Sequence, residues 1–438
     1  MGHAAIKNTS GGLGRFAVLA VICLCCLLCA CDDGSERFAS ATVAPTRLTA
    51  LVWAPDWPDE MHQIADEFHR AHPDITVDVQ FMIGNSVEEN LKPKVATHNL
   101  PDLVSLNPNA YAAELADQGI LADIGGSAAW DNMLESLKPD WTSRRGKRFG
   151  MSGGVAATLI YYNKAMFRKA GITTLPTNFE EFLAACAALR KAGFTPIVWT
   201  GAFPNTLANG PFSFGFANNV VAHHADDWKA RIADGSLDLK NDAVTDIFAK
   251  IKLIADKGYV QRDYMNTGYD EGIRLFAEGH AAMAFQGTWS SGQLMPDNSA
   301  DVGIFVPPWN APGKTVVPVV GNETGFAVCE TRNKKAALKF LEFIYGKGYP
   351  ILQNKRHNIP PLKQVAGKVV TDPQIVEYMQ RVTQAPLTAG PYYSYLPTNT
   401  IDLLHRLLQD VLLGKKSPRQ AALALGKSIR HEARTENK

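Results

Sequence analysis

The side chains best placed for chemistry in this sequence are aromatic and polar residues that follow apolar, strand-like segments. Trp53, Asp56 and Trp57 follow the first such segment, and Trp289 ends a Gly-Thr-Trp triplet after the uncharged segment 281–286. In parallel α/β sheets, ligands lie beyond the carboxyl ends of the strands, so we look for the site there. Aromatic rings supply contact area and polar groups fix orientation, which suits non-covalent recognition of a small molecule.

Three further candidates stand just after other strand-like segments: Asn107, Asn109 and Trp199. Each candidate also has a purely structural interpretation. Asparagines are common turn residues, and a tryptophan at this position could belong to the core. In the same way, Asp56 or Trp57 could simply begin the helix at Pro58.

The sequence offers little support for catalysis or metal binding. It contains no His-Glu-x-x-His pair and no Gly-rich phosphate-binding loop. His223 and His224 lie close to Asp226 and Asp227, but adjacent histidines on a loop rarely face one ion, and no Cys or third His is placed to help. We therefore predict no metal ion, no cofactor and no enzymatic activity.

Alternating strands and helices must position the candidate residues. Strand-like runs at 47–54, 75–82 and 102–106 alternate with helical patterns in units of about 30 residues, which indicates a parallel sheet covered by helices. A second series begins after Gly153 and Gly154. Its expected strands are 158–163, 196–199, 281–286, 302–306 and 324–329. Its expected helices are about 177–191, 242–255 and 334–345, and the C-terminal part, 401–427, is expected to be helical.

The N-terminal region predicts export and lipid attachment. Fifteen uninterrupted apolar residues, 16–30, end in Leu28-Cys29-Ala30-Cys31, and only Lys7 and Arg15 carry charge before Cys31. This is typical of a secretory signal, and the run is shorter than the roughly 20 residues of a membrane span. Its last four residues resemble the bacterial lipobox, in which Cys31 carries the lipid; a plain signal peptide or an unprocessed anchor is the alternative. We expect a signal peptide at 1–30 and a flexible stalk at 31–45.

Composition limits what the remaining body can be. Nearly 400 residues exceed the size at which one core keeps growing, so two lobes are expected. The chain has a formal charge of +1, and loss of residues 1–30, with two basic residues and no acid, leaves −1. This balance excludes nucleic acid as a partner, because its recognition needs a basic footprint. Cys186 and Cys329 lie in apolar patterns and are interpreted as buried thiols, with a disulfide as the less favoured alternative.

An ordered set of segments resembles the extracellular solute-binding proteins of ABC importers, in the sugar-binding group that includes maltose-binding protein. The segments are 68–77, 100–104 with 115–121, 159–167, 276–283 running to Gly287-Thr288-Trp289, and 325–328 with 336–341. The resemblance implies an α/β, two-lobe periplasmic-binding-protein fold of type II. Each lobe would be a mainly parallel sheet flanked by helices, joined by hinge crossovers near 154, 322 and 362. Lobe 1 would comprise 46–154 plus 325–362 and lobe 2 would comprise 155–324 plus 363–438, with a ligand between them and a hinge that closes.

The resemblance also implies roles for particular residues. It places ligand contacts in the loops that carry Trp53 and Asn107, and Trp289 matches a Gly-x-Trp whose ring stacks on sugar. Glu323, at the second crossover, is a candidate acceptor or a residue that only caps the hinge. One tyrosine of the segment 392–395, taken as Tyr393, is expected to face the cleft. A sugar offers hydroxyls and an apolar ring face, which planar polar groups and aromatic rings match.

The function that the resemblance implies is that of a lipid-anchored, monomeric substrate-binding component of an ABC importer. It would capture a mono- or oligosaccharide outside the cytoplasmic membrane and deliver it to the permease subunits. Asp32, after the lipid cysteine, resembles an inner-membrane retention signal. Maltose-type members carry an acidic residue just before the Tyr-Asn-Lys strand, whereas segment 154–157 has none, so maltodextrin itself is disfavoured.

Two other classes of function remain as alternatives. An anchored carbohydrate-active hydrolase would need two carboxylates facing each other about 5–10 Å apart. A binding protein for a polyamine would need a ring of acids, and one for a glycerol phosphodiester would need clustered Arg or Lys. Neither kind of cluster is evident at the predicted strand ends.

Overall fold

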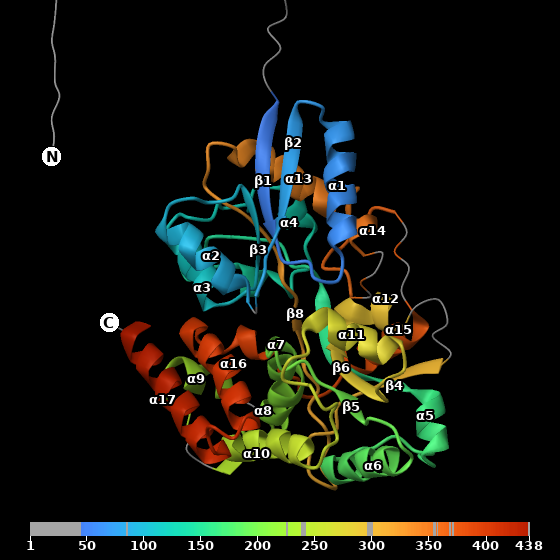
Figure 1. Cartoon of the computed structure of the whole chain (residues 1–438). Helices are drawn as coiled ribbons and strands as arrows, with labels where there is room; N and C mark the ends of the chain where they lie inside the picture. Colours follow the sequence, from blue (N-terminus) through green and yellow to red (C-terminus); the bar gives the residue numbers. More distant parts are fainter. Residues whose placement is uncertain are drawn as a thin grey trace, which may run out of the picture. The chain divides into compact units, whose positions relative to one another are not determined.

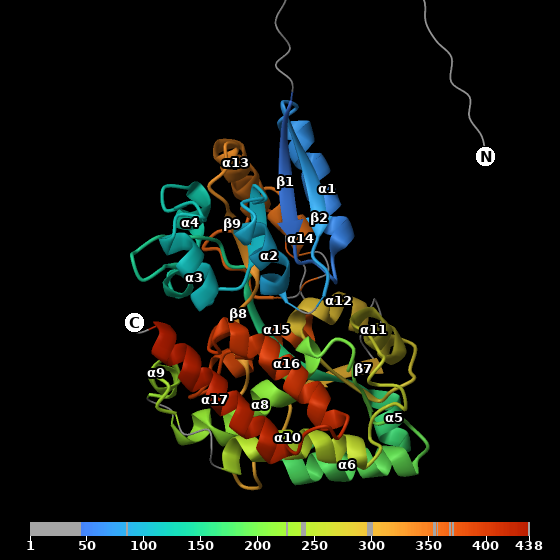
Figure 2. The ribbon, with the colours of Figure 1, turned by 60° about the vertical axis from the view of Figure 1, so that its left-hand side comes forward.

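The computed structural model describes residues 45–436, except 85, 225–226, 238–241, 296–300, 354–355, 357, 368 and 370–371. The predicted signal peptide, the predicted lipid attachment site at Cys31 and nearly all of the predicted stalk lie outside the described residues. Residues 44–438 group into one compact unit, which contains two sheets flanked by helices (Figures 1 and 2). Within the described part of the chain, none of the helices combines the length and the apolar character needed to cross a bilayer.

The first sheet is built around the N-terminal strand. β1 (Thr46–Val52) pairs in parallel with β2 (Ile75–Phe81) and with β3 (Leu103–Leu106), and β9 (Gly325–Val328) adds to β3 in the antiparallel direction. The sheet order is β2-β1-β3-β9. This sheet is therefore mainly parallel, as the sequence predicts.

Two long helices cover this sheet, α1 (Pro58–Ala71) and α13 (Lys334–Tyr345). Proline stands at the first turn of α1, where its missing N–H costs no hydrogen bond. The helices meet through Phe68 and Phe340, whose ring centroids lie 4.9 Å apart. Segments about 270 residues apart thus share one core, which also contains the thiol of Cys329.

The second sheet is centred on β4 (Val155–Asn163). β6 (Met283–Gly287), β7 (Val302–Phe305) and β8 (Val320–Asn322) all pair with β4 in the antiparallel direction, and β5 (Ile197–Val198) pairs in parallel with β6. The expectation of a mainly parallel second sheet is therefore wrong. Strand patterns indicate which face is buried, whereas the direction of a neighbouring strand depends on the connection that brings it there.

Helices cover both faces of the second sheet, and the last two helices of the chain form a further helical layer. α16 (Thr398–Leu412) and α17 (Pro418–Glu436) pack against each other and against α10 (Asp242–Asp256), as Figure 2 shows. The remaining helical elements are α2 (Val87–Ala96), α3 (Ala110–Asp117), α4 (Ala128–Asn132), η1 (Lys138–Trp141), α5 (Lys164–Lys169), α6 (Phe179–Lys191), α7 (Asn205–Leu207), η2 (Ala208–Phe212), α8 (Ser213–Asn219), η3 (Val221–His223), α9 (Trp228–Ala233), α11 (Tyr269–Ala277), η4 (Thr288–Ser290), α12 (Ser291–Leu294), α14 (Tyr349–Leu352), α15 (Pro373–Thr383) and η6 (Tyr392–Ser394).

The buried apolar residues form separate cores. One core belongs to the first sheet, and two others lie about the second sheet. Cys186 and Cys329 belong to different cores, and both are free thiols. The lobe limits predicted from the sequence remain a proposal, which these separate cores support.

Candidate functional site

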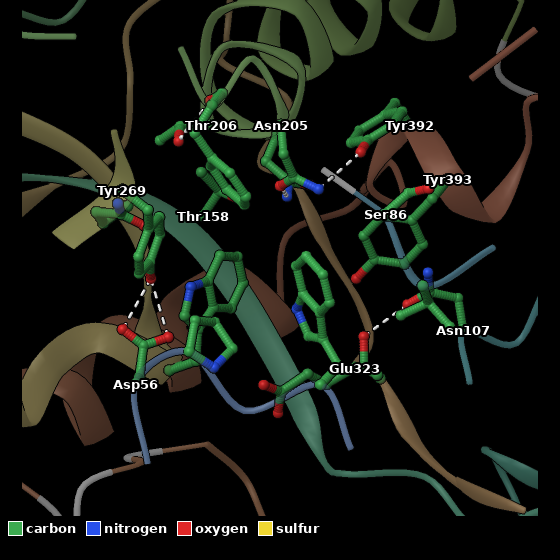
Figure 3. A pocket seen from close by; sticks show the side chains of 18 of the residues that line it. Asp56, Ser86, Asn107, Thr158, Asn205, Thr206, Tyr269, Glu323, Tyr392 and Tyr393 are labelled. Carbon is green, nitrogen blue, oxygen red and sulfur yellow. Dashed lines mark hydrogen bonds between the residues drawn. The ribbon is translucent and has the colours of Figure 1, made fainter. Parts of the chain in front are cut away.

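A pocket with about 880 Å³ of space, part of it open to solvent, lies where loops and helices from both sheets meet. The loop after β1, the start of α2 and the residues after β3 contribute from the first side. The segments after β5, β6 and β8 and the start of η6 contribute from the second. Figure 3 shows side chains from these elements converging on it. The aromatic and polar residues that line this pocket include Trp53, Asp56, Trp57, Glu88, Asn107, Phe203, Asn205, Asn209, Tyr269, Trp289, Glu323, Tyr392 and Tyr393.

Asp56 links the two sides of the pocket. Its carboxylate oxygens accept hydrogen bonds from the Tyr269 hydroxyl at 2.8 and 2.9 Å, and Figure 3 shows this tyrosine pointing at the carboxylate. Ser290 donates to the same carboxylate at 3.3 Å. The side chain is only 3% exposed, and burial raises its pKa to about 7, although the two hydroxyl donors oppose the shift. This carboxyl therefore holds its proton to near-neutral pH.

Glu323 and Arg356 form a buried ion pair beside Asp56. The guanidinium also lies over the Trp57 ring, 4.7 Å from its centroid, and Asn358 donates a further hydrogen bond to Glu323. Burial raises the pKa of Glu323, and Arg356 opposes that shift. Arg356 is 1% exposed, and its Nε and one terminal nitrogen have no hydrogen-bond partner among the described residues. The pair thus fixes the Trp57 ring and the Glu323 carboxylate at the pocket wall.

A third buried carboxylate, Glu88, enters from the first turn of α2. It accepts hydrogen bonds from the side-chain amides of Asn109 at 2.6 Å and Asn107 at 3.3 Å. Asn107 in turn accepts a bond from the Thr324 hydroxyl at 2.6 Å, which joins it to the β8–β9 connection. Glu88 is 2% exposed, and burial raises its pKa. Glu88 lines the pocket, although it lies in a helix and does not directly follow a strand.

Aromatic rings from both sides form the apolar walls. Trp53 stacks on Phe203 with ring centroids 6.3 Å apart and an interplanar angle of 21°, and Phe203 meets Tyr269 edge-on at 5.1 Å. Trp289 covers Gly287, because a Cβ added to that glycine would lie 2.2 Å from the tryptophan ring. These faces are of the kind that pack on the C–H face of a sugar ring.

The structure brings together most of the residues predicted from the sequence. The pocket is lined by seven of them, namely Trp53, Asp56, Trp57, Asn107, Trp289, Glu323 and Tyr393. Asn109 lies just behind the wall, where its side chain caps α3 through Ala112 and donates to Glu88. Trp199 is 2% exposed in the core of the second sheet, against Tyr264. Its predicted ligand contact therefore has no support from the pocket geometry.

The pocket also contains residues that were not predicted by choosing the residues just after expected strands. Glu88 comes from a helix, Phe203, Asn205 and Asn209 come from the segment after β5, and Tyr269 begins α11. No local pattern distinguishes them from ordinary helix or turn residues. In the part of the chain that the structure describes, no group of three or more His, Cys, Asp or Glu side chains is arranged to hold a metal ion. His223 and His224 are described, whereas Asp226 lies outside the described residues.

Two α/β lobes with a polar and aromatic pocket between them define a two-lobed ligand-binding protein. Residues 54–349 match the family described as bacterial extracellular solute-binding protein, and the chain belongs to this family. A multiple sugar-binding protein of Streptococcus mutans is 21% identical over 65% of this chain and 67% of its own length. A diacetylchitobiose-binding protein of Streptomyces coelicolor is 22% identical over 76% of this chain and 77% of its own length.

Solved structures show the same fold. The structure of a chitin oligosaccharide-binding protein superimposes with a TM-score of 0.77 at 22% identity, covering 89% of this chain and 100% of the other. This likeness confirms the fold class predicted from the sequence, two periplasmic-binding-protein lobes of mixed α/β structure.

Proposed function

We propose that this chain is the substrate-binding component of an ABC importer, which captures a mono- or oligosaccharide between its lobes and delivers it intact to a membrane permease. The observation that carries this proposal is the pocket itself. Aromatic faces such as Trp53 and Trp289 stand beside planar carboxylates and amides, and both sheets contribute them. Family membership and the sugar-binding names of the relatives support the same ligand class.

We further propose that the protein acts outside the cytoplasmic membrane, as a monomer held by lipid on Cys31. Two or more acyl chains give stable attachment, whereas one gives only marginal binding. In a membrane fractionation, Cys31→Ser should move the protein from the detergent-extractable fraction to the soluble or precursor fraction. An unchanged distribution would remove the lipid anchor from the proposal.

We propose no catalytic role for this pocket. The pKa of Asp56 near 7 would suit a general acid, but its oxygens are engaged by Tyr269 and Ser290. The segment 150–154 has the Gly-x-Ser-x-Gly spacing of a nucleophile turn, yet Ser152 is fully buried, bonds Asn322 and leads into a strand instead of a helix. Release of reducing sugar from any bound glycoside would contradict this assignment.

A thermal-unfolding screen of the detergent-solubilised chain against sugars, polyamines and glycerol phosphodiesters tests the ligand class. A ligand at 100 times its Kd stabilises the folded protein by about 2.7 kcal/mol, so a true ligand raises the Tm. Trp289→Ala should remove that rise while leaving the ligand-free protein folded. Trp289→Phe, which keeps a flat ring, is the matched control and should retain part of the rise. A full Tm shift in Trp289→Ala would reject the role of this ring.

A further inference from the structure

The charges that line the pocket are unbalanced. Among the described lining residues, Asp56, Glu88 and Glu323 are acidic, and none is Lys, Arg or His. The guanidinium of Arg356 lies behind the wall and pairs with Glu323. Hydroxyl groups contact Asp56 and amides contact Glu88, all of them neutral donors. Three buried carboxylates therefore line the pocket, and the guanidinium of Arg356 forms an ion pair with one of them, Glu323.

Burial of these carboxylates in their ionised form costs free energy unless a positively charged group pairs with them or they bind protons. Burial without a counter-charge disfavours an ionised carboxylate. The pKa values of all three carboxyls are raised, and burial is the largest cause in each case. A positively charged ligand group would supply the missing charge.

An independent observation concerns Asn209, which lines the pocket and contacts Asn205. The side-chain oxygen of Asn209 is buried and has no hydrogen-bond partner among the described residues, although the residue lines the pocket and is only 7% exposed. Its amide nitrogen donates to Asn205 at 2.8 Å, and the Asn205 amide donates to the Tyr392 hydroxyl at 3.0 Å. Figure 3 shows this second bond. The side-chain oxygen of Asn209 is thus a hydrogen-bond acceptor without a donor among the described residues.

The hydrogen-bond chain behind Asn209 is anchored on a buried histidine. Tyr392 and the Nε2 atom of His405 lie 3.0 Å apart. Burial lowers the pKa of His405 to about 4, so its ring is neutral at physiological pH. With Nε2 as the acceptor, the Tyr392 hydroxyl donates to it and accepts from Asn205. The chain then runs in one direction and holds the Asn209 amide with its oxygen unpaired.

We propose that the natural ligand is an amino sugar with a free, protonated amino group. This inference rests on the proposed function and names the chemical class of its ligand. An ammonium group offers donors without acceptors, which matches a pocket that presents three carboxylates and an unpaired amide oxygen. The aromatic walls add a surface that attracts cations as well as sugar rings. The sugar ring itself is needed to cover those walls, which distinguishes this ligand from a linear polyamine.

A matched ligand series tests the inference on the full chain. β-1,4-linked glucosamine dimer, its N-acetylated form and cellobiose differ only at C2, where they carry an amine, an acetamide or a hydroxyl. The monomers glucosamine, N-acetylglucosamine, glucose, galactosamine and galactose extend the series, and spermidine is added as a cation without a ring. Titration calorimetry at pH 7 should show the amine forms bound about tenfold or more tightly than their neutral counterparts, the gain typical of hydrogen bonds to a charged group.

A variant locates the preference in the pocket. Glu88→Gln removes one carboxylate and should reduce the ratio of amine to hydroxyl affinity severalfold. Glu114→Gln, an exposed carboxylate on α3, is the matched control and should leave the ratio unchanged. From about pH 5 to pH 6.5, where the amino group of the ligand keeps its proton, the affinity for the amine should rise as the carboxyls ionise, whereas the affinity for a neutral sugar should not rise.

The possible results distinguish a failure of the amino-sugar inference from a failure of the proposed sugar-binding function. If neutral sugars bind as tightly as the amines, or if Glu88→Gln leaves the ratio intact, the amino-sugar inference is overturned and the sugar-binding function stands. If no amine in the series binds, the amino-sugar inference is overturned, and the wider thermal-unfolding screen of sugars decides the sugar-binding function. Binding of spermidine alone rejects both, in favour of a polyamine-binding protein.

Discussion

The buried carboxyl of Asp56 makes a quantitative prediction about stability and pH. Its usual pKa of 3.8 is raised to about 7 by burial. Tyr269 and Ser290 donate to it, Gln293 bonds its backbone oxygen, and the charges of Glu323 and Arg356 act on it in opposite directions. The perturbation is Asp56→Asn, which keeps the shape of the side chain and removes the titration.

The sign and size follow from linkage between protonation and folding. Because the folded pKa of Asp56 is raised, its contribution to stability is full below pH 3.8 and is lost as the pH rises to about 7. Each pKa unit corresponds to about 1.4 kcal/mol. Between pH 5 and pH 8, the free energy of unfolding should therefore fall by about 3 kcal/mol more in the wild type than in Asp56→Asn.

Urea unfolding of both proteins across this pH range, followed by tryptophan fluorescence, measures the difference. Asp59→Asn, which removes an exposed carboxylate at the start of the same helix, is the matched control and should follow the wild type. Tyr269→Phe removes a donor that lowers the Asp56 pKa, so it should move the loss of stability to higher pH. Parallel pH profiles for wild type and Asp56→Asn would refute the reasoning.

Two further predictions concern the walls of the pocket. Arg356→Met leaves the Glu323 carboxylate buried without its counter-charge and should lower the free energy of unfolding by about 3–5 kcal/mol in urea titrations. The double variant with Glu323→Gln should recover much of that loss. A double variant as unstable as Arg356→Met would contradict the ion-pair account. Gly287→Ala places a Cβ 2.2 Å from the Trp289 ring and should weaken sugar binding by about tenfold in calorimetry. Gly126→Ala, where nothing lies within 4 Å of the added atom, is its control and should bind normally, and equal affinities for both variants would show that the ring position is irrelevant.

The rule of choosing residues just after predicted strands selected residues that line the pocket, because it depends on local sequence. Apolar runs of fixed length end at recognisable turns, so Trp53, Asp56, Asn107 and Trp289 could be selected before their neighbours were known. The same rule selected Trp199, which follows β5 but lies in the core. Position after a strand does not determine which way a side chain points, because that depends on the residues packed around it.

The pocket residues that the sequence did not predict take their positions from contacts with other segments of the chain. Glu88 is an ordinary first-turn acid of a helix by sequence, and burial against Asn107 and Asn109 gives it its unusual environment. Asn209 lies in a π-helical segment, and its orientation is fixed by way of Asn205 and Tyr392, the latter 187 residues beyond Asn205 in the chain. Neither relation leaves a signal in a single sequence.

The sequence by itself determined the secondary elements, the order of the strand–helix units and the solute-binding family, because periodicity and turn residues act over short distances. The tertiary structure decided the antiparallel pairing of the second sheet, the burial of three carboxylates at one pocket and the unpaired oxygen of Asn209. These features arise where segments far apart in the chain exclude water together. Desolvation is a property of the assembled pocket, and no residue carries it alone.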